Sequence, residues 1–402
     1  MDQVRLGCEL LAAQWDDTRG RWELETSTGP IHATVLISAV GPFGDPVVPP
    51  LPGKDRFLGT ATHTFGWQAG PQDIQGRRVA VIGTGASVQV IPAIQPDAGK
   101  VLVFQRTPCW IMPRFNPRSG WAGRILRRLS PVRAIEQAVQ YALYESYGTF
   151  NFIDPRFAGA FEAVARMQLR RQVPDPGLRA ELTPDYRIGC KRAAVSSNYL
   201  PAFSKPNVAL VTEGRAEITE HGIRTDDGRQ HEVDTIVWAT GFSMVNSTAR
   251  RIVGRNDSSL ADVYEQRPQS YLGVSVAGFP NLFLTSGTFG GAGNQSFLYM
   301  LESQFAYIVD ALRTMREKNI AVVDVTEDAQ EKFVQEAEKR SAATIWLTGG
   351  CNGYYTTPDG TRNAGLWPDW SFNYRRRLTH FHHAAYEVRT ADVTVPSTAP
   401  EV

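Results

Sequence analysis

Residues 77–94 constrain the fold more than any other stretch of the sequence. They read RRVAVIGTGASVQVIPAI, an apolar strand that runs into a glycine turn and then into a helix. Gly83 and Gly85 permit a tight bend and a close approach of the backbone to a pyrophosphate at the amino end of the helix, where free N–H groups and the helix dipole favour anions. This order of elements is typical of a dinucleotide-binding βαβ unit of the Rossmann type.

The glycine signature alone is weak, because its third position holds Val88 where glycine or alanine would let the helix and strand pack closely. Arg106, at the end of the second predicted strand (100–107), strengthens the prediction. An NAD site presents a carboxylate there, whereas a cation suits the 2′-phosphate of NADP. A surface arginine that merely ends an edge strand is the alternative. The residues expected to hold NADP(H) are Gly83, Gly85, Ser87, Arg106 and Thr107.

The composition leaves room for more than one domain and argues against several functions. The 402 residues are 42% hydrophobic and 21% charged, with a formal net charge of +1. Without a broad positive field we expect no nucleic-acid partner, and the basic stretches 124–129 and 374–383 are interpreted as solvated helix faces. The sequence contains no run of about 18 apolar residues, and it therefore predicts no membrane span.

The cysteine and histidine patterns predict no metal site. The four cysteines are scattered without C-x-x-C spacing, at Cys8, Cys109, Cys190 and Cys351. This spacing predicts reduced thiols and a cytoplasmic location. His380, His382 and His383 lie close together, but no cysteine or carboxylate motif accompanies them.

Two β-rich meanders suggest two domains of similar architecture. They cover residues 4–41 and 207–241, and each closes with an apolar strand that ends in glycine. The proline-rich stretch 41–53 predicts an extended linker. Further expected elements are a mostly helical region at 119–182, a buried strand at 281–287 and a long amphipathic helix at 296–315.

A second motif lies just ahead of the glycine turn. FLGTATHTFGW fits the pattern F-x-G-x-x-x-H-x-x-x-W with Phe57, Gly59, His63 and Trp67. On this motif the sequence resembles the flavin-dependent Baeyer–Villiger monooxygenases, close to the hydroxyacetophenone-type enzymes. The resemblance continues through VAVIGTGAS, VFQRTP, GCKR, DTIVWATGF, GFPNLFL, ESQFAYI and WLTGGCNGYY, and so covers nearly the whole chain. The sequence departs from the family at Gln68, where proline is usual, and after Ser87, where the turn is one residue short. Such a deletion rotates the following helix face by about 100°.

The resemblance implies an α/β fold of the kind found in flavoproteins with two dinucleotide-binding domains, here a Rossmann-like NADP domain and an incomplete FAD domain. Members of the family begin with an FAD-binding βαβ unit, and the sequence given starts after it. Residues 1–50 are then expected to be the remainder of the FAD domain. Residues 51–268 would form the NADP domain with a helical insert at about 115–185, and residues 269–402 would return to the FAD domain and supply the C-terminal segment.

The resemblance also implies a chemistry. In the family NADPH reduces FAD, O₂ adds at the flavin C4a atom, and the peroxide attacks a ketone that rearranges to an ester or lactone. Arg192 matches the catalytic arginine, because a permanently protonated cation stabilises a peroxyanion without giving it a proton. Lys191 matches a contact to the 2′-phosphate, and Trp346 a tryptophan near the nicotinamide ribose or, alternatively, a core side chain. Phe57, Gly59, His63 and Trp67 would act in the linker between domains.

Two other functions stay open on the sequence. One is a non-catalytic remnant with at most weak NADP binding. The other is an N- or S-oxygenating flavin monooxygenase, which Trp67 disfavours. The expected partners are a small-molecule ketone and O₂, and the sequence does not specify which ketone.

Overall fold

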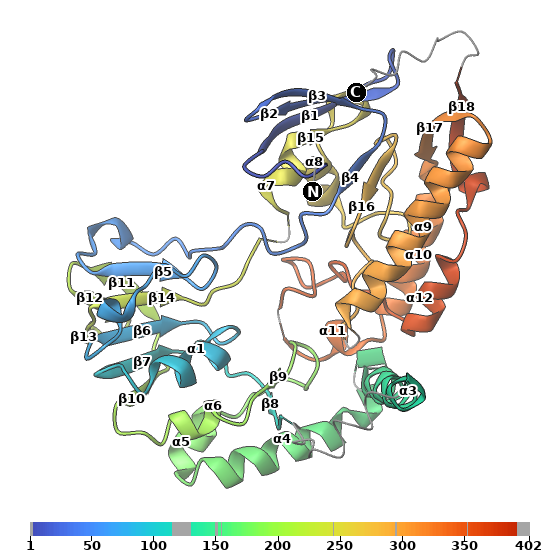
Figure 1. Ribbon diagram of the computed structural model, residues 1–402. Helices are drawn as coiled ribbons and strands as arrows, with labels where there is room; N and C mark the ends of the chain where they lie inside the picture. Colours follow the sequence, from blue (N-terminus) through green and yellow to red (C-terminus); the bar gives the residue numbers. More distant parts are fainter. Residues whose placement is uncertain are drawn as a thin grey trace.

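The computed structural model of the chain describes residues 3–114, 130–148, 152–153, 155–243, 245–293, 296–351 and 353–391. Figure 1 shows two lobes joined by two chain crossings. The first lobe contains a parallel sheet. The second contains both the first strands and the last helices of the chain.

Five parallel strands form the central sheet of the first lobe, in the order β10-β7-β6-β14-β5. Strands β6, β7 and β14 are apolar and buried along almost their whole length, since both faces of the sheet are covered. The strands are β5 (Thr60–His63), β6 (Arg78–Ile82), β7 (Lys100–Phe104), β10 (Val208–Val211) and β14 (Thr235–Trp238).

Alternate residues of these strands face opposite layers. Val79 and Val81 of β6 pack with α1 (Ser87–Ile94) and α6 (Tyr199–Ala202). Ala80 and Ile82 pack with an antiparallel meander on the other face. That meander is β11 (Arg215–Thr219), β12 (Gly222–Thr225) and β13 (Gln230–Glu232). The strand–turn–helix–strand unit and the second meander expected from the sequence are thereby confirmed.

The order of the strands reverses at β6. The chain first adds β7 and β10 on one side of β6, and then places β14 on the other side, next to β5. In open parallel sheets, ligands bind at the carboxyl ends of the strands where the order reverses. The fold therefore directs attention to the ends of β6 and β14.

The second lobe is built on the first meander, as expected. It contains the antiparallel strands β1 (Leu10–Asp16), β2 (Arg21–Thr26) and β3 (Gly29–Ala33), and a parallel pair of β4 (Leu36–Ser38) with β16 (Leu282–Leu284). Strand β15 (Ile252–Val253) pairs with β1. Because of this pairing, the chain returns to the second lobe well ahead of residue 268, where the sequence had placed the boundary.

The remaining helices surround this lobe (Figure 1). The long amphipathic helix expected at 296–315 is α9 (Phe297–Glu317), whose inner face joins an aromatic core with Phe333, Trp367 and Tyr374. The other C-terminal elements are β17 (Ile320–Val325), α10 (Glu327–Ser341), α11 (Ile345–Thr348), α12 (Ser371–Arg377) and β18 (Tyr386–Thr390). In the part of the chain that the structure describes, no helix combines the length and apolar character that a membrane span requires.

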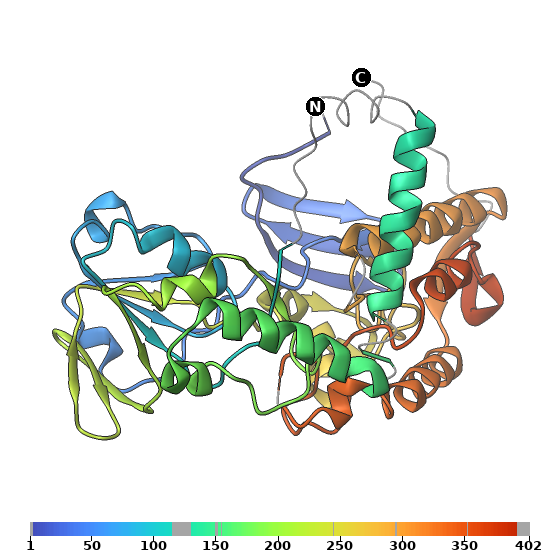
Figure 2. The same ribbon diagram turned by 90° about the horizontal axis from the view of Figure 1, so that it is seen from below.

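The predicted helical region contains α3 (Ser130–Gly148), α4 (Ala158–Gln172) and α5 (Pro176–Glu181). Residues 115–129 of this region lie outside the described residues. Figure 2 shows α3 projecting beside the second lobe. It is attached through Tyr141 and Glu145, which hydrogen-bond to Ser371 of α12.

Asp324 on β17 ties three segments of the second lobe together. Its carboxylate accepts a hydrogen bond from the backbone of Gly278 (3.1 Å) and forms an ion pair with Arg255 (2.8 Å). The side chain is buried, and burial raises the pKa of Asp324 to about 6, although the charge of Arg255 opposes this.

We expect Asp324 to make stability depend on pH. Because its pKa is higher in the folded than in the unfolded chain, the folded state binds more protons between pH 3.8 and about 6. As the pH rises through this window, the free energy of unfolding should fall relative to that of an Asp324→Asn variant, by up to about 3 kcal/mol. Urea titrations of both proteins at several pH values measure this. A difference that stays constant from pH 4 to pH 7 would contradict the assignment.

Candidate functional site

The glycine turn after β6 lies against the end of β14. Gly83 has φ +109°, and a Cβ atom at this position would overlap the carbonyl oxygen of Ala239. Only glycine satisfies both the dihedral angle and the close approach. A Cβ atom at Gly85, in contrast, would meet no other atom within 4 Å. The turn is thus closed toward the sheet and open on its outer side.

Helix α1 begins directly after this turn. No side chain caps its amino end. Ser87 is fully buried and Val88 packs into the core, so this end offers a ligand its backbone rather than these side chains. The prediction that Ser87 binds the cofactor therefore stays a prediction, and the contact would be made by its backbone N–H.

Two predicted cofactor residues meet beside the turn. Arg106 is exposed just after β7, and Lys191 is half-buried with its Nζ atom 5.2 Å from the centre of the Tyr186 ring. Burial lowers the pKa of Lys191, and the charge of Arg106 lowers it further. The two cations therefore lie near enough to repel each other. Thr107 is half-buried next to Arg106.

A cysteine anchors the Arg106 segment to the glycine turn. The Cys109 thiol donates a hydrogen bond to the carbonyl oxygen of Thr84 (3.3 Å). Burial raises the pKa of Cys109 to about 12, so this thiol is protonated and unreactive at neutral pH.

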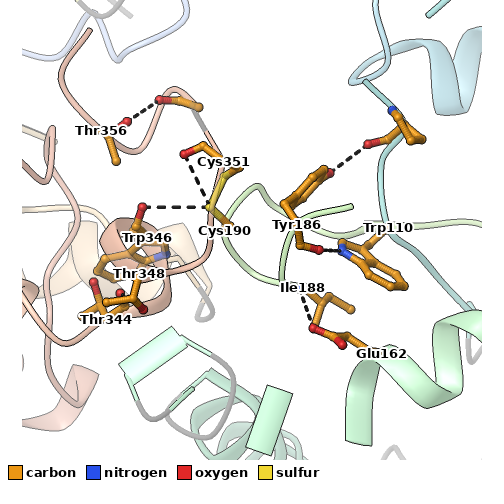
Figure 3. Close-up of a disulfide and its surroundings, with 12 residues drawn as sticks. Trp110, Glu162, Tyr186, Ile188, Cys190, Thr344, Trp346, Thr348, Cys351 and Thr356 are labelled. Carbon is orange, nitrogen blue, oxygen red and sulfur yellow. Dashed lines mark hydrogen bonds between the residues drawn. A yellow bond between two sulfur atoms is a disulfide. The ribbon is translucent and has the colours of Figure 1, made fainter. Parts of the chain in front are cut away.

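The expectation of four reduced thiols is wrong for one pair. Cys190 and Cys351 form a disulfide with their Cα atoms 6.0 Å apart (Figure 3), while Cys8 and Cys109 are free. The two residues are separated by 161 positions, and only the fold brings them together. The bond ties the loop that carries Lys191 and Arg192 to the C-terminal segment of the second lobe.

Arg192 and Trp346 flank this disulfide. Arg192 is exposed, and its charge opposes the burial that raises the pKa of Tyr354, which places the guanidinium near that ring. Trp346 on α11 is buried against Phe152 and Tyr355. Its indole nitrogen has no hydrogen-bond partner among the residues that the structure describes. Trp346 is thus a core side chain whose N–H is left for another group.

The two chain crossings between the lobes pair with each other. Residues 41–53 leave the second lobe, and residues 239–243 run back alongside them (Figure 1). They are joined by backbone hydrogen bonds from Val47 to Gly241 (2.9 Å) and from Ser243 to Asp45 (2.9 Å). The linker expected at 41–53 is therefore extended, as predicted, and it has a partner that the sequence did not reveal.

Phe242 is the centre of this junction. Its ring contacts Phe43, His63 and Phe65, with ring centres 5.3 to 5.6 Å apart. His63 Nδ1 accepts a hydrogen bond from the backbone of Phe65 (3.0 Å), and burial lowers the pKa of His63. His63 is therefore neutral at pH 7 and lies at the end of β5.

The predicted linker motif is divided between the two ends of β5. Phe57 and Gly59 precede the strand, where a Cβ atom on Gly59 would overlap the carbonyl oxygen of Asp234. His63 ends the strand and Trp67 follows it, with Trp67 40% exposed. The first pair thus packs the sheet, and the second pair lies at the carboxyl edge with the glycine turn.

The carboxyl edge of the sheet brings together Gly83, Arg106 and His63 from β6, β7 and β5. Reasoning from the sequence missed two residues there, Phe242 and Arg215. Phe242 follows the glycine that closes β14, and Arg215 follows β10 much as Arg106 follows β7. Both residues come just after the end of a parallel strand, and this position in the sequence could have identified them.

Comparison with known proteins gives relatives that are monooxygenases by name. No family model matches the sequence. A Baeyer–Villiger monooxygenase of Streptomyces coelicolor is 37% identical over 99% of this chain and 77% of its own length. One of Pseudomonas aeruginosa is 34% identical over 98% and 76%. The crystal structure of OTEMO in complex with FAD and NADP superimposes with a TM-score of 0.83 at 25% identity, over 96% of this chain and 82% of that one. This likeness confirms the α/β class of flavin monooxygenases with two dinucleotide-binding domains.

The glycine turn yields a prediction with an internal control. Gly83→Ala should lower the free energy of unfolding by about 3 kcal/mol or more, because it places a Cβ atom on a residue of positive φ and against the carbonyl oxygen of Ala239. Gly85→Ala should change it by less than about 1 kcal/mol, since its Cβ atom meets open space. Denaturant titrations of the two variants measure the difference. If both variants lose the same free energy of unfolding, the Gly83–Ala239 contact does not determine the stability of the turn.

Proposed function

Because the chain belongs to the Baeyer–Villiger monooxygenase family, we propose that it inserts one oxygen atom of O₂ into a ketone and gives an ester or lactone, with NADPH and FAD as cofactors. Membership makes the chain a flavin-dependent monooxygenase by family. The ketone, the product and the roles of single residues are the proposal, as is the cytoplasmic location. The observation that carries it is the set of cations beside the glycine turn, which suits the 2′-phosphate of NADPH.

The described residues fit NADPH. The Gly83 turn is closed against Ala239 and open outward at Gly85, which leaves space for a pyrophosphate at the backbone. Arg106, Thr107 and Lys191 would hold the 2′-phosphate, since charge-assisted hydrogen bonds to phosphate are strong. The unpartnered indole N–H of Trp346 would meet the nicotinamide ribose.

FAD fits the chain less completely. The sequence contains one glycine turn of this kind, and its cations suit NADPH. We therefore assign no residue of this chain to the pyrophosphate of FAD. When bound, NADPH supplies a hydride and the flavin carries the oxygen that reaches the substrate.

Arg192 would hold the negative charge that develops on oxygen. Its guanidinium stays protonated at every relevant pH, so it stabilises an anion without donating a proton to it. The Cys190–Cys351 disulfide fixes the loop that carries Lys191 and Arg192. A preorganised cation at this point costs no reorganisation during the reaction.

His63 and Trp67 would act as positioning residues. His63 is neutral and packs on Phe242, which lies in the returning crossing. The glycine turn contacts Ala239, at the start of that crossing. A ligand that moves the turn would therefore also shift the contact between Phe242 and His63. We therefore propose that the motif couples cofactor binding to lobe motion and takes no part in bond formation.

Replacement of Arg192 tests the proposed chemistry. With FAD, NADPH, O₂ and a panel of ketones, Arg192→Ala should lower ester formation by about 10²- to 10³-fold, because the developing anion loses its cation. NADPH oxidation should persist, with hydrogen peroxide as the product. Arg192→Lys should restore only part of the yield, since lysine has a different donor geometry. Product analysis by gas chromatography and peroxide assay measures both effects.

Arg170→Ala, which removes an exposed arginine from α4, is the control and should leave the ester yield unchanged. Unchanged ester yield in Arg192→Ala would contradict the role of Arg192. N-oxide or sulfoxide without any ester from the unaltered protein would assign it to the N- or S-oxygenating monooxygenases. NADPH binding without turnover of any substrate would support the non-catalytic alternative.

A further inference from the structure

A third cation lies at the carboxyl edge of the nucleotide sheet, beyond the end of β10. Strand β10 pairs in parallel with β7, so the two strands end side by side. Arg106 follows β7, and Arg215 begins β11 after residues 212–214, which connect it to β10. Arg106 interacts electrostatically with both Arg215 and Lys191, which come from two other segments of the chain.

The surroundings of Arg215 leave part of its guanidinium unsatisfied. The side chain is partly buried, and its Nε atom is buried with no hydrogen-bond partner among the residues described. A buried donor without a partner is unfavourable, and a ligand that accepts a hydrogen bond from it would remove this cost.

One cation, Arg106, and one carboxylate, Asp226, act on the charge of Arg215. Burial lowers the pKa of Arg215, and the charge of Arg106 lowers it further, whereas Asp226 opposes both. Asp226 is held over the turn by a backbone hydrogen bond to Gly214 (2.9 Å), and no ion pair joins it to Arg215 among the described residues. One carboxylate thus faces Arg215 and another, Asp185, faces Lys191. Arg106 therefore repels both Lys191 and Arg215, and a bound anion beside Arg106 would relieve both repulsions.

We infer that Arg215 is a specificity-determining residue of the nucleotide site, where it binds the 2′-phosphate of NADPH together with Arg106 and Lys191. This inference rests on the proposed function, because it assumes NADPH at the glycine turn. Arginine suits the position, since its planar fork donates two hydrogen bonds to one phosphate and its Nε–H is already desolvated. Asp226 would limit the affinity by repelling the phosphate.

Ligand binding without turnover tests the role of Arg215. The probes are 2′,5′-ADP, which carries the 2′-phosphate, AMP, which lacks it, and inorganic phosphate. In titration calorimetry at fixed salt, Arg215→Ala should weaken 2′,5′-ADP by about tenfold to a hundredfold and leave AMP unchanged. Arg215→Lys should retain part of the affinity. Asp226→Asn should tighten 2′,5′-ADP, because a competing negative charge is removed.

The matched control is Arg229→Ala, on the same meander, where the guanidinium is exposed and lies 3.9 Å from Asp227. It should leave the binding of both nucleotides unaffected.

If Arg106→Ala weakens the binding of 2′,5′-ADP but neither Arg215 variant does, Arg215 lies outside the site, and the inference fails while the proposed function stands. Equal losses for AMP and 2′,5′-ADP would overturn it in favour of a structural role. Inorganic phosphate that competes as well as 2′,5′-ADP would overturn it in favour of a general anion site. An unaltered protein without preference for 2′,5′-ADP over AMP would overturn the NADPH assignment itself.

Discussion

The contact between Gly83 and the carbonyl oxygen of Ala239 is the constraint on which the rest of the site depends. It holds the turn after β6 against the end of β14, at the point where the strand order reverses. The residues that follow Ala239 leave the sheet at once and form the returning crossing. One backbone contact therefore sets both the shape of the nucleotide turn and the point where the chain leaves the sheet toward the second lobe. A side chain at Gly83 would disturb both, and this accounts for glycine better than turn propensity does.

Two connections on opposite sides of the site link the lobes. One is the pair of crossings around Phe242, and the other is the disulfide between Cys190 and Cys351. Arg106 belongs to the nucleotide sheet, whereas Lys191 and Arg192 lie on a loop bonded to the C-terminal segment of the second lobe. The Lys191 loop is also held on the segment after Arg106, because β9 (Ala194–Val195) pairs with β8 (Ile111–Met112) and Tyr186 hydrogen-bonds to Pro108. An anion that contacts Arg106 and Lys191 together would therefore bind in the nucleotide lobe, beside the disulfide that joins this lobe to the second one.

Much of the nucleotide lobe could be predicted from local sequence. The apolar strands around Val81 and Val103 alternate between two buried layers, and the glycine turn needs dihedral angles that few residues adopt. Three features could not be predicted, namely the Cys190–Cys351 bond, the pairing of the two crossings and the approach of Arg215 to Arg106. Each joins positions that are distant in the sequence, and their meeting depends on how whole elements pack. The return of the chain before residue 268 was missed for the same reason, since it depends on the pairing of β15 with β1.

The unsatisfied polar groups show where the fold departs from its most stable packing. Native structures leave few buried polar atoms without a partner, because each costs about 1–3 kcal/mol. Among the described residues, these atoms are His63 Nε2, Ser87 Oγ, Gln105 Oε1, Gln168 Oε1, Tyr199 Oη, Arg215 Nε and Trp346 Nε1. Those of His63, Ser87, Gln105 and Arg215 lie at the carboxyl edge of the nucleotide sheet, and that of Trp346 lies beside the disulfide, whereas those of Gln168 and Tyr199 lie in helices α4 and α6. Functional sites are where local rules of packing are expected to be broken. The same edge that the strand order marks as a ligand site is thus also marked by polar groups that the protein itself does not satisfy.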